Sequence, residues 1–364
     1  MSGRSGYLPT LDGWRAVAIA MVMIAHVTDA LFAAGAPYEA PAWFGLTRHG
    51  ALGVDVFFGI SGFLITSRLL EEHEHRGRIS LPGFYIRRFC RIIPPYYVFL
   101  AALAALTVAG RIAIERPELQ ASAFFVRNYF GLRLPAGWYS GHLWSLAVEE
   151  HFYLLWPTLL VLLTPRRARL GVVLFALAVA AWRVAEFRLG LLSRLLGPDV
   201  SFYFRTDIRF DALLWGCAAA FVYHHPRASA IASRWLSTPS WTALVVLFVA
   251  IVALHPPMAM AWQAMIIPCL LLGTVLHPRR VAARFLESPP MRWSGRISYS
   301  LYLWQQLFLA PWMLYPALPL GALQRLPLNI LATVVAAAAS YYLIERPMIK
   351  VGHRLAAPVT EGRA

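Results

Sequence analysis

A basic pair in the first apolar segment is the clearest candidate for chemistry. Arg15 and His26 are eleven positions apart, and eleven residues advance an α-helix by about 1100°, which is three turns plus roughly 20°. Their side chains therefore share one helix face, about 16 Å apart along the axis. An arginine fork binds phosphate oxygens bidentately, and a buried neutral histidine suits a general base. The alternative is structural, with Arg15 as a membrane-surface anchor and His26 as a hydrogen-bonded core residue.

The second apolar segment contains a carboxylate and a step of small residues within 53–64. Asp55 lies near its start, where it is either a functional carboxylate or an anion stabilised by the helix N-terminus. Ser61 and Gly62 follow, and small residues let helices approach closely. Packing is therefore the favoured role of Ser61 and Gly62.

Two adjacent acids, Glu149 and Glu150, lie well inside a later apolar segment. Adjacent side chains point about 100° apart on a helix, so at least one carboxylate should face the interior of a helical bundle. Either glutamate orients or tunes His26, or it pairs with an intramembrane arginine such as Arg183. Ionisable groups in a bilayer cost roughly 2.5 kcal/mol or more each, which favours a functional interpretation.

An arginine cluster, Arg87, Arg88 and Arg91, comes just before the third apolar segment. Basic residues beside a membrane segment usually set topology or contact lipid headgroups. Because this cluster falls on the same predicted side as Arg15, it is also a candidate site for phosphate groups.

A further group of charges, Asp207, Arg209 and Asp211, falls at the outer end of the sixth apolar segment. Charges of mixed sign this close together are typical of a structural ion-pair network. We favour that interpretation over a catalytic one.

The elements that must position these residues follow from composition. The 364 residues are 59% hydrophobic and only 14% charged, whereas a typical soluble domain has about 25% charged residues. Apolar stretches of about 17 to 25 residues recur, which is the length that crosses a hydrocarbon core. Lipid offers backbone groups no water to bond, so the expected fold is all-α, a polytopic transmembrane helical bundle. About ten spans are predicted, at residues 14–33, 51–70, 93–110, 143–163, 170–188, 210–224, 240–255, 261–276, 297–315 and 328–344.

The distribution of charge orients this bundle. Lys and Arg concentrate on one side, for example at Arg87, Arg166 and Arg279, and the positive-inside tendency makes that side cytoplasmic. Ten spans put both termini there, which predicts a multi-pass protein of the inner membrane. Topology thus explains the formal charge of +15, and we expect no nucleic-acid partner. The largest inside loop is predicted at 71–92, and the largest outside loop, 111–142, is long enough to cover a substrate site.

The chain is expected to form a single domain over 1–364, with a core at about 7–350 and a short cytoplasmic tail at 351–364. Its first apolar run, 11–32, is longer than the apolar part of a usual signal peptide and contains charged residues, so we expect a retained span. No appended soluble domain is expected. No metal site is expected either, since the three cysteines show no CxxC spacing.

Taken together, these stretches resemble the membrane-bound acyltransferase family 3, an O-acetyltransferase group that modifies bacterial polysaccharides and related acceptors. The resemblance covers nearly the whole chain. Its pattern Arg-x10-His falls on Arg15 and His26. The other matching blocks are 11–16, 53–64, 88–94, 143–149 with Glu150 following, 209–213, 297–304 and 345–347.

The resemblance implies roles for individual residues. His26 is the family's essential histidine and the general base, with Glu149 and Glu150 as further catalytic candidates. Three arginines hold the phosphates of the donor, namely Arg15, Arg88 and Arg91. Candidate supporting residues within the matching blocks are Asp12, Asp55, Ser61 and Trp144.

The resemblance also implies the reaction. A membrane-bound O-acyltransferase would move an acyl group, usually acetyl, from cytoplasmic acyl-CoA to a hydroxyl at or near the outer face of the membrane. Acetyl-CoA is then a substrate, and no permanently bound cofactor is expected. Carbohydrate, glycolipid and macrolide-type hydroxyls all suit the acceptor. We expect direct transfer in a ternary complex, with a route through an acyl-histidine as the alternative.

The chain departs from the family pattern at one position, where Gln305 and Gln306 stand in place of a frequent histidine. A hydrogen-bonding role is expected there instead of proton transfer. Many members of the family also carry a fused periplasmic domain of the SGNH type, so a periplasmic partner protein is expected to supply any second step. A rival interpretation is a transporter or flippase of a lipid-linked sugar, because buried Arg, His and Glu also suit a permeation path.

Overall fold

The computed structural model describes residues 7–32, 50–130, 137–197, 200–311 and 318–361, and every regular element in these ranges is helical. The predicted all-α class is therefore confirmed. The elements of the first half are α1 (Pro9–Phe32), α3 (Ala51–Arg76), α4 (Leu81–Val108), α5 (Arg116–Ala123), η1 (Arg127–Tyr129), α6 (Trp138–Gly141), α7 (Leu143–Leu189), α8 (Leu191–Leu196), η2 (Phe202–Phe204) and α9 (Thr206–His224). Those of the second half are α10 (Pro226–Trp235), α11 (Thr238–Leu254), α12 (Ala259–Leu276), α13 (Val281–Leu286), α14 (Pro289–Arg296), α15 (Ser298–Phe308), η3 (Gly321–Gln324), α16 (Leu328–Ser340), the π-helical turn η4 (Tyr341–Glu345) and α17 (Arg346–Glu361).

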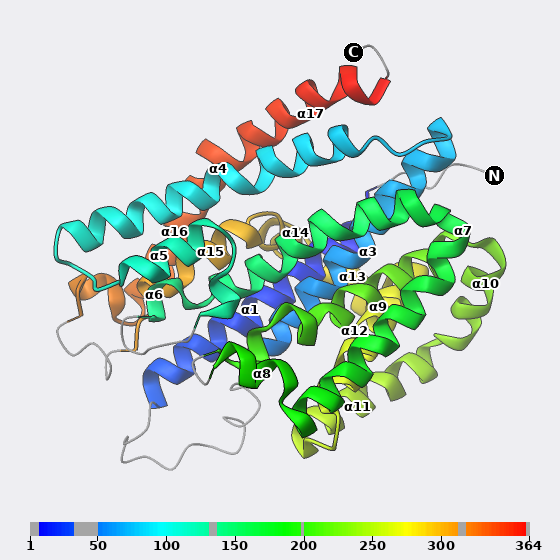
Figure 1. Cartoon of the computed structure of the whole chain (residues 1–364), viewed down its shortest axis with the longest axis horizontal. Coiled ribbons are helices and arrows are strands. Elements are labelled where there is room, and N and C mark those ends of the chain that lie inside the picture. Colours follow the sequence, from blue (N-terminus) through cyan, green and yellow to red (C-terminus); the bar gives the residue numbers. More distant parts are fainter. Residues whose placement is uncertain (1–6, 33–49, 131–136, 198–199, 312–317, 362–364) are drawn as a thin grey trace.

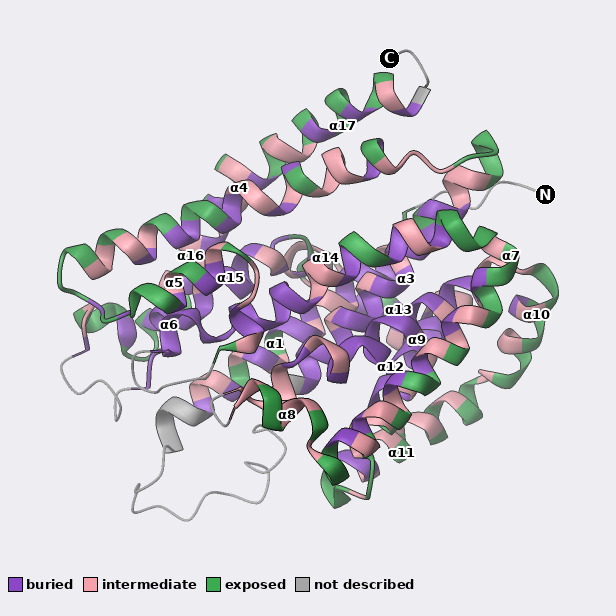
Figure 2. Ribbon diagram, viewed as in Figure 1, coloured by how far each residue is buried: buried purple, intermediate pink, exposed green. Residues whose placement is uncertain are grey.

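Helices α1, α3 and α9 form the buried centre of the bundle (Figures 1 and 2). Gly62 lets α3 and α9 approach closely, because a Cβ atom there would lie 1.9 Å from the carbonyl oxygen of Leu213. The same contact is repeated one turn away, where a Cβ on Gly216 would lie 2.3 Å from the carbonyl oxygen of Gly59. The predicted packing role of Gly62 is therefore confirmed.

Helix α7 consists of two arms that meet at a sharp bend (Figure 1). Thr164, with φ of 61° and ψ of 151°, is the non-helical residue at the bend, and Pro165 follows it. A proline disfavours the helical conformation of the residue before it, which explains the break. The two arms correspond to the predicted spans 143–163 and 170–188.

Helices α4 and α17 lie side by side along one edge of the bundle (Figure 1). Helix α3 continues to Arg76 and α4 begins at Leu81, so the predicted loop 71–92 is wrong for most of its length. Ser80 caps α4 by accepting a hydrogen bond from the Gly83 backbone N–H at 3.2 Å. Most of the predicted tail is likewise helical, because α17 extends through residue 361.

Ten predicted spans each fall on a helix, but the number of crossings stays a prediction. In the described ranges, six helices are long and apolar enough to cross a membrane, or up to seven if the bent pair α10 and α11 is one span. Helix α15 has only 11 residues between 298 and 308, and residues 312–315 of the predicted ninth span lie outside the described ranges. The polytopic character is confirmed.

Candidate active site

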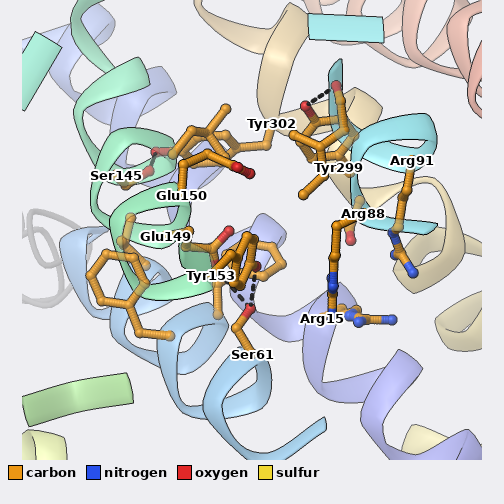
Figure 3. Close-up of a pocket in the computed structure, with 16 residues that line it drawn as sticks. Arg15, Ser61, Arg88, Arg91, Ser145, Glu149, Glu150, Tyr153, Tyr299 and Tyr302 are labelled. Atoms are coloured by element: carbon orange, nitrogen blue, oxygen red, sulfur yellow. Dashed lines mark hydrogen bonds between the residues drawn. The ribbon is translucent and has the colours of Figure 1, made fainter. Parts of the chain in front are cut away.

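One pocket, which we name the central pocket, gathers most of the predicted site residues (Figure 3). It lies between α1, α3, α4, α7 and α15. Three arginines stand on one side of it and two glutamates on the other, with tyrosines between them (Figure 3). The polar residues that line it are Arg15, Ser61, Arg88, Arg91, Ser145, Glu149, Glu150, Tyr153, Ser298, Tyr299 and Tyr302.

The three arginines Arg15, Arg88 and Arg91, named here the pocket arginines, come from two helices. Arg88 and Arg91 are three residues apart on α4, so they share one face of that helix. The guanidinium of Arg88 lies 4.8 Å from the ring centroid of Tyr153. Arg15 contacts Asp12 at 3.3 Å, one turn earlier on α1. Within the described part of the chain, no carboxylate forms an ion pair with Arg88 or Arg91, so neither guanidinium group is held by a carboxylate.

Asp12 supports Arg15 from outside the central pocket. Its carboxylate accepts a hydrogen bond from the Tyr7 hydroxyl at 2.7 Å and lies within 3.3 Å of the Arg15 guanidinium. The predicted supporting role of Asp12 therefore has a structural counterpart, since these contacts hold the Arg15 side chain in place.

The opposite wall of the pocket carries the two glutamates. Ser61 donates a hydrogen bond to Glu149 at 2.7 Å and accepts one from the Tyr153 hydroxyl at 3.2 Å. Ser61 thus points into the pocket, unlike Gly62, and its role is not packing alone. Glu149 and Glu150 both line the same wall, so the structure brings both carboxylates to the pocket.

Neither glutamate pairs with Arg183, because that arginine forms its ion pair with Asp211. This pair is one of four beside α9 that join buried or, at Asp207, partly buried charges, and we name the set the ion-pair network. It comprises Arg183–Asp211, Arg205–Glu186, Arg205–Asp207 and Arg209–Asp55. The structural interpretation of Asp207, Arg209 and Asp211 is confirmed.

Two candidate supporting residues belong to this network and not to the central pocket. Asp55 is buried in its ion pair with Arg209. The ring of Trp144 lies 5.7 Å from the Arg209 guanidinium and 4.7 Å from the ring of Phe204. Asp55 and Trp144 therefore stabilise the fold beside the site.

His26 lies beyond the pocket and is not one of its lining residues. Its Nδ1 atom is 2.6 Å from Oε1 of Gln305, and its ring is 5.3 Å from that of Trp138. On α15, Tyr302 lines the pocket and Gln305 follows one turn later, about 4.5 Å further along the axis. Thus α1 and α15 both lead from the pocket toward His26. The contact with Gln305 helps to orient the His26 ring, whereas both glutamates line the pocket beyond which His26 lies.

The described part of segment 111–142 reaches His26, while its location on the outer side of the membrane stays a prediction. Trp138 of α6 contacts His26 and donates from Nε1 to the carbonyl oxygen of Gln306 at 2.8 Å. Behind it, Arg127 donates to Ser140 at 3.2 Å and pairs with Glu118 at 3.3 Å. Burial lowers the pKa of Arg127 and Glu118 opposes that shift, so these contacts hold the helical segment that covers His26.

Sequence reasoning missed several residues of the site. Tyr153 is four residues after Glu149, so helical spacing could have placed it on the Glu149 face. The available signal for Tyr299 and Tyr302 was their position within the matching block 297–304. Arg68 of α3 lines two further pockets that share Arg15 and Arg91 with each other. No spacing signal marked Arg68, because only the fold brings α3 beside α4.

These features define a class, a polytopic α-helical membrane protein with a charged pocket inside the bundle. A family model described as an acyltransferase domain matches residues 8–345. The chain belongs to this acyltransferase domain family. The resemblance seen in the sequence is therefore confirmed.

Similar proteins have related descriptions. A protein of Listeria monocytogenes serovar 1/2a, named peptidoglycan O-acetyltransferase OatA, is 30% identical over 95% of this chain and 56% of its own length. A putative O-acetyltransferase of Staphylococcus aureus (strain COL) is 29% identical over 95% of this chain and 58% of its own. The putative peptidoglycan O-acetyltransferase YrhL of Bacillus subtilis (strain 168) is 28% identical over 96% of this chain and 56% of its own length. The chain thus spans little more than half the length of these relatives. No solved structure matches it.

Proposed function

We propose that this protein is a membrane-bound O-acetyltransferase that moves an acetyl group from acetyl-CoA to a hydroxyl of a carbohydrate acceptor of the peptidoglycan type. The observation that carries the proposal is the central pocket, where three arginines, two of them without an ion pair among the described side chains, face carboxylates and tyrosines. Arginine forks match phosphate oxygens, and the names of the relatives support acetyl transfer to a glycan. We propose entry of the donor from the arginine side, taken as cytoplasmic, and binding of the acceptor near the outer face.

The two walls would fix the direction of the bound donor. Its diphosphate would bind the pocket arginines, while Glu149 and Glu150 would repel it from the far wall. The uncharged pantetheine arm carries amide groups that can donate hydrogen bonds to those carboxylates. In this orientation the thioester points past Tyr302 toward His26, and His26 lies about 16 Å from Arg15 along α1.

His26 would act as general base. When its Nδ1–H donates to Gln305, Nε2 is the unprotonated nitrogen and can accept the proton of the acceptor hydroxyl. The oxygen then attacks the thioester carbonyl, forming the ester C–O bond as the C–S bond breaks. The departing thiolate of CoA takes up a proton, which the imidazolium can return. The acetyl group passes to the acceptor oxygen and the hydroxyl proton passes to the CoA thiolate, so the reaction needs no other reactant.

Acetyl transfer is tested with purified protein in nanodiscs, peptidoglycan fragments and acetyl-CoA radiolabelled in the acetyl group. The wild type should place label on the glycan as a base-labile ester. His26→Ala should lower the rate by roughly 10²- to 10⁴-fold, the usual contribution of a general base. The matched control is His75→Ala, which removes an exposed histidine from the far end of α3.

The outcomes separate the alternatives. A transporter of a lipid-linked sugar would leave the label on CoA while moving the unlabelled lipid between leaflets. Full activity of His26→Ala in correctly folded protein would contradict the assignment of the base while leaving the reaction itself in place.

A further inference from the structure

The basic surface of the central pocket continues into a second pocket, which we name the entrance pocket. The two share Arg15, Arg88 and Arg91, and the entrance pocket adds Arg68 of α3 and His353 of α17. Arg68 also lines a third pocket that contains Arg15 and Arg91, but it does not line the central one. Arg87 also lines the entrance pocket, but Arg68 is the cation that the entrance pocket and the third pocket share and the central pocket lacks.

Helix geometry gives Arg68 its place relative to the central pocket. It follows Ser61 by seven residues on α3, which is two turns less about 20°, so the two side chains share a face. The separation is about 10 Å along the axis. Arg68 thus extends the site by roughly 10 Å away from Glu149, toward the α4 and α17 side of the bundle.

The charge of Arg68 has no partner among the described side chains. Arg87, the neighbouring cation of the entrance pocket, contacts Glu72 at 3.2 Å, whereas Arg68 forms no ion pair or side-chain hydrogen bond in the described ranges. Its side chain is exposed to the pocket. Four arginines, Arg15, Arg68, Arg88 and Arg91, therefore line this pocket, and among the described side chains only Arg15 forms an ion pair, with Asp12.

The amount of charge discriminates between classes of thioester donor. A CoA thioester carries a diphosphate with about two negative charges and a ribose phosphomonoester with about 1.5 to 2 more. A thioester on a carrier protein is linked through one phosphodiester, with about one negative charge. Four arginines spread over two connected pockets match the first class, because a single phosphodiester would leave most of them uncompensated.

We propose that Arg68 binds the ribose phosphomonoester of the donor in the entrance pocket, while the pocket arginines bind its diphosphate. The site therefore selects free CoA thioesters over dephosphorylated analogues and over thioesters on carrier proteins. This inference rests on the proposed function for the identity of the donor.

Binding to purified full-length protein in nanodiscs tests the inference without requiring transfer. Titration calorimetry compares CoA with 3′-dephospho-CoA. The wild type should bind CoA roughly ten- to a hundredfold more tightly, the range for a hydrogen bond to a charged group. Arg68→Gln should weaken CoA binding to the level of dephospho-CoA and leave dephospho-CoA binding unchanged. The matched control, Arg76→Gln, removes the same charge from the end of α3 and should preserve the preference.

Several results would overturn the inference. Equal affinities of the wild type for the two nucleotides would do so without any variant. So would an Arg68→Gln effect of the same size on both ligands, or equal weakening by Arg76→Gln. If Arg68→Gln does not fold, Arg68→Lys is compared instead and should retain part of the preference. Absence of acetyl transfer in wild type that still prefers CoA would contradict the proposed reaction and not the phosphate site.

Discussion

Arginines occur in two regions of this protein, and their surroundings differ. In the ion-pair network beside α9, Arg205 and Arg209 are almost fully buried and each contacts at least one carboxylate. In the central pocket, Arg15 remains about one-fifth exposed, and neither Arg88 nor Arg91 has an acidic partner in the described ranges. The same residue type thus serves the fold in one region and leaves positive charge available to a ligand in the other.

Whether an arginine has an ion-pair partner helps to distinguish a structural charge from a functional one. A buried charge costs several kcal/mol unless it is paired, so pairing indicates that the protein satisfies it. Converging charges of one sign repel each other, and the fold gains nothing from holding them together. Their placement is explained by a ligand of opposite charge.

The largest effect on stability is expected when one partner of a buried ion pair is removed from the ion-pair network. Arg209→Met should lower the free energy of unfolding by about 3–5 kcal/mol, because Asp55 is left buried without its partner. The double variant Asp55→Leu with Arg209→Met should recover much of this loss. Thermal unfolding of the detergent-purified protein measures both, and equal midpoints for the single and double variants would contradict the pairing argument.

The next effect concerns the pocket arginines. Arg91→Gln should raise the KM for acetyl-CoA by roughly ten- to a hundredfold, the range for a charge-assisted hydrogen bond. It should not lower the unfolding midpoint, because it removes like-charge repulsion. Arg166→Gln, at an exposed position after the bend of α7, is the matched control and should change neither quantity. A lower unfolding midpoint in Arg91→Gln would instead assign Arg91 a structural role, like that of the arginines in the ion-pair network.

A smaller effect is expected at the link between α15 and His26. Gln305→Leu should lower kcat by about tenfold, since it removes a hydrogen bond worth about 1 kcal/mol and the orientation that this bond provides. The KM for acetyl-CoA should stay unchanged. Gln305→Glu keeps an acceptor and should retain more of kcat. A change confined to KM would assign Gln305 to donor binding.

The smallest effect is expected at Ser61. Ser61→Ala removes the hydrogen bond to Glu149 but leaves that carboxylate in a polar pocket, so kcat/KM should fall only a few-fold. The steady-state assay with labelled acetyl-CoA measures it. Gly62→Ala is the contrasting change, since its Cβ would lie 1.9 Å from the Leu213 carbonyl oxygen, and it should reduce folded protein instead of activity per folded molecule.

Much of the fold was predictable because lipid restricts the chain to helices. Each predicted segment falls at least in part on a helix, including both arms of α7, whereas the number of membrane crossings stays a prediction. The connections were less predictable, since polar residues after Leu70 and before Ile92 suggested a loop, yet α3 and α4 continue as helices there. The length of an apolar stretch indicates where a helix contacts lipid. It does not indicate where the helix ends, because helical turns that lie in water can consist of polar residues.

The site was predictable where one helix carried the signal. Shared-face spacing placed Arg15 and His26 on one side of α1, and both glutamates do line the pocket with the arginines. Partners from distant helices were not predictable. Arg183 was therefore considered as an ion-pair partner of the glutamates, and the contact between Gln305 and His26 was not foreseen. Spacing along the chain carries no information about which helices pack together.

The bend of α7 has a consequence for how the chain enters a membrane. No loop separates its two arms, so if both arms cross the membrane they form one tight hairpin. Arg166, Arg167 and Arg169 follow the bend, and their positive charge would favour the cytoplasmic side for its tip. Thr164 holds a conformation that is costly for any residue except glycine. The turn that reverses the chain between the two arms therefore carries backbone strain in the folded molecule.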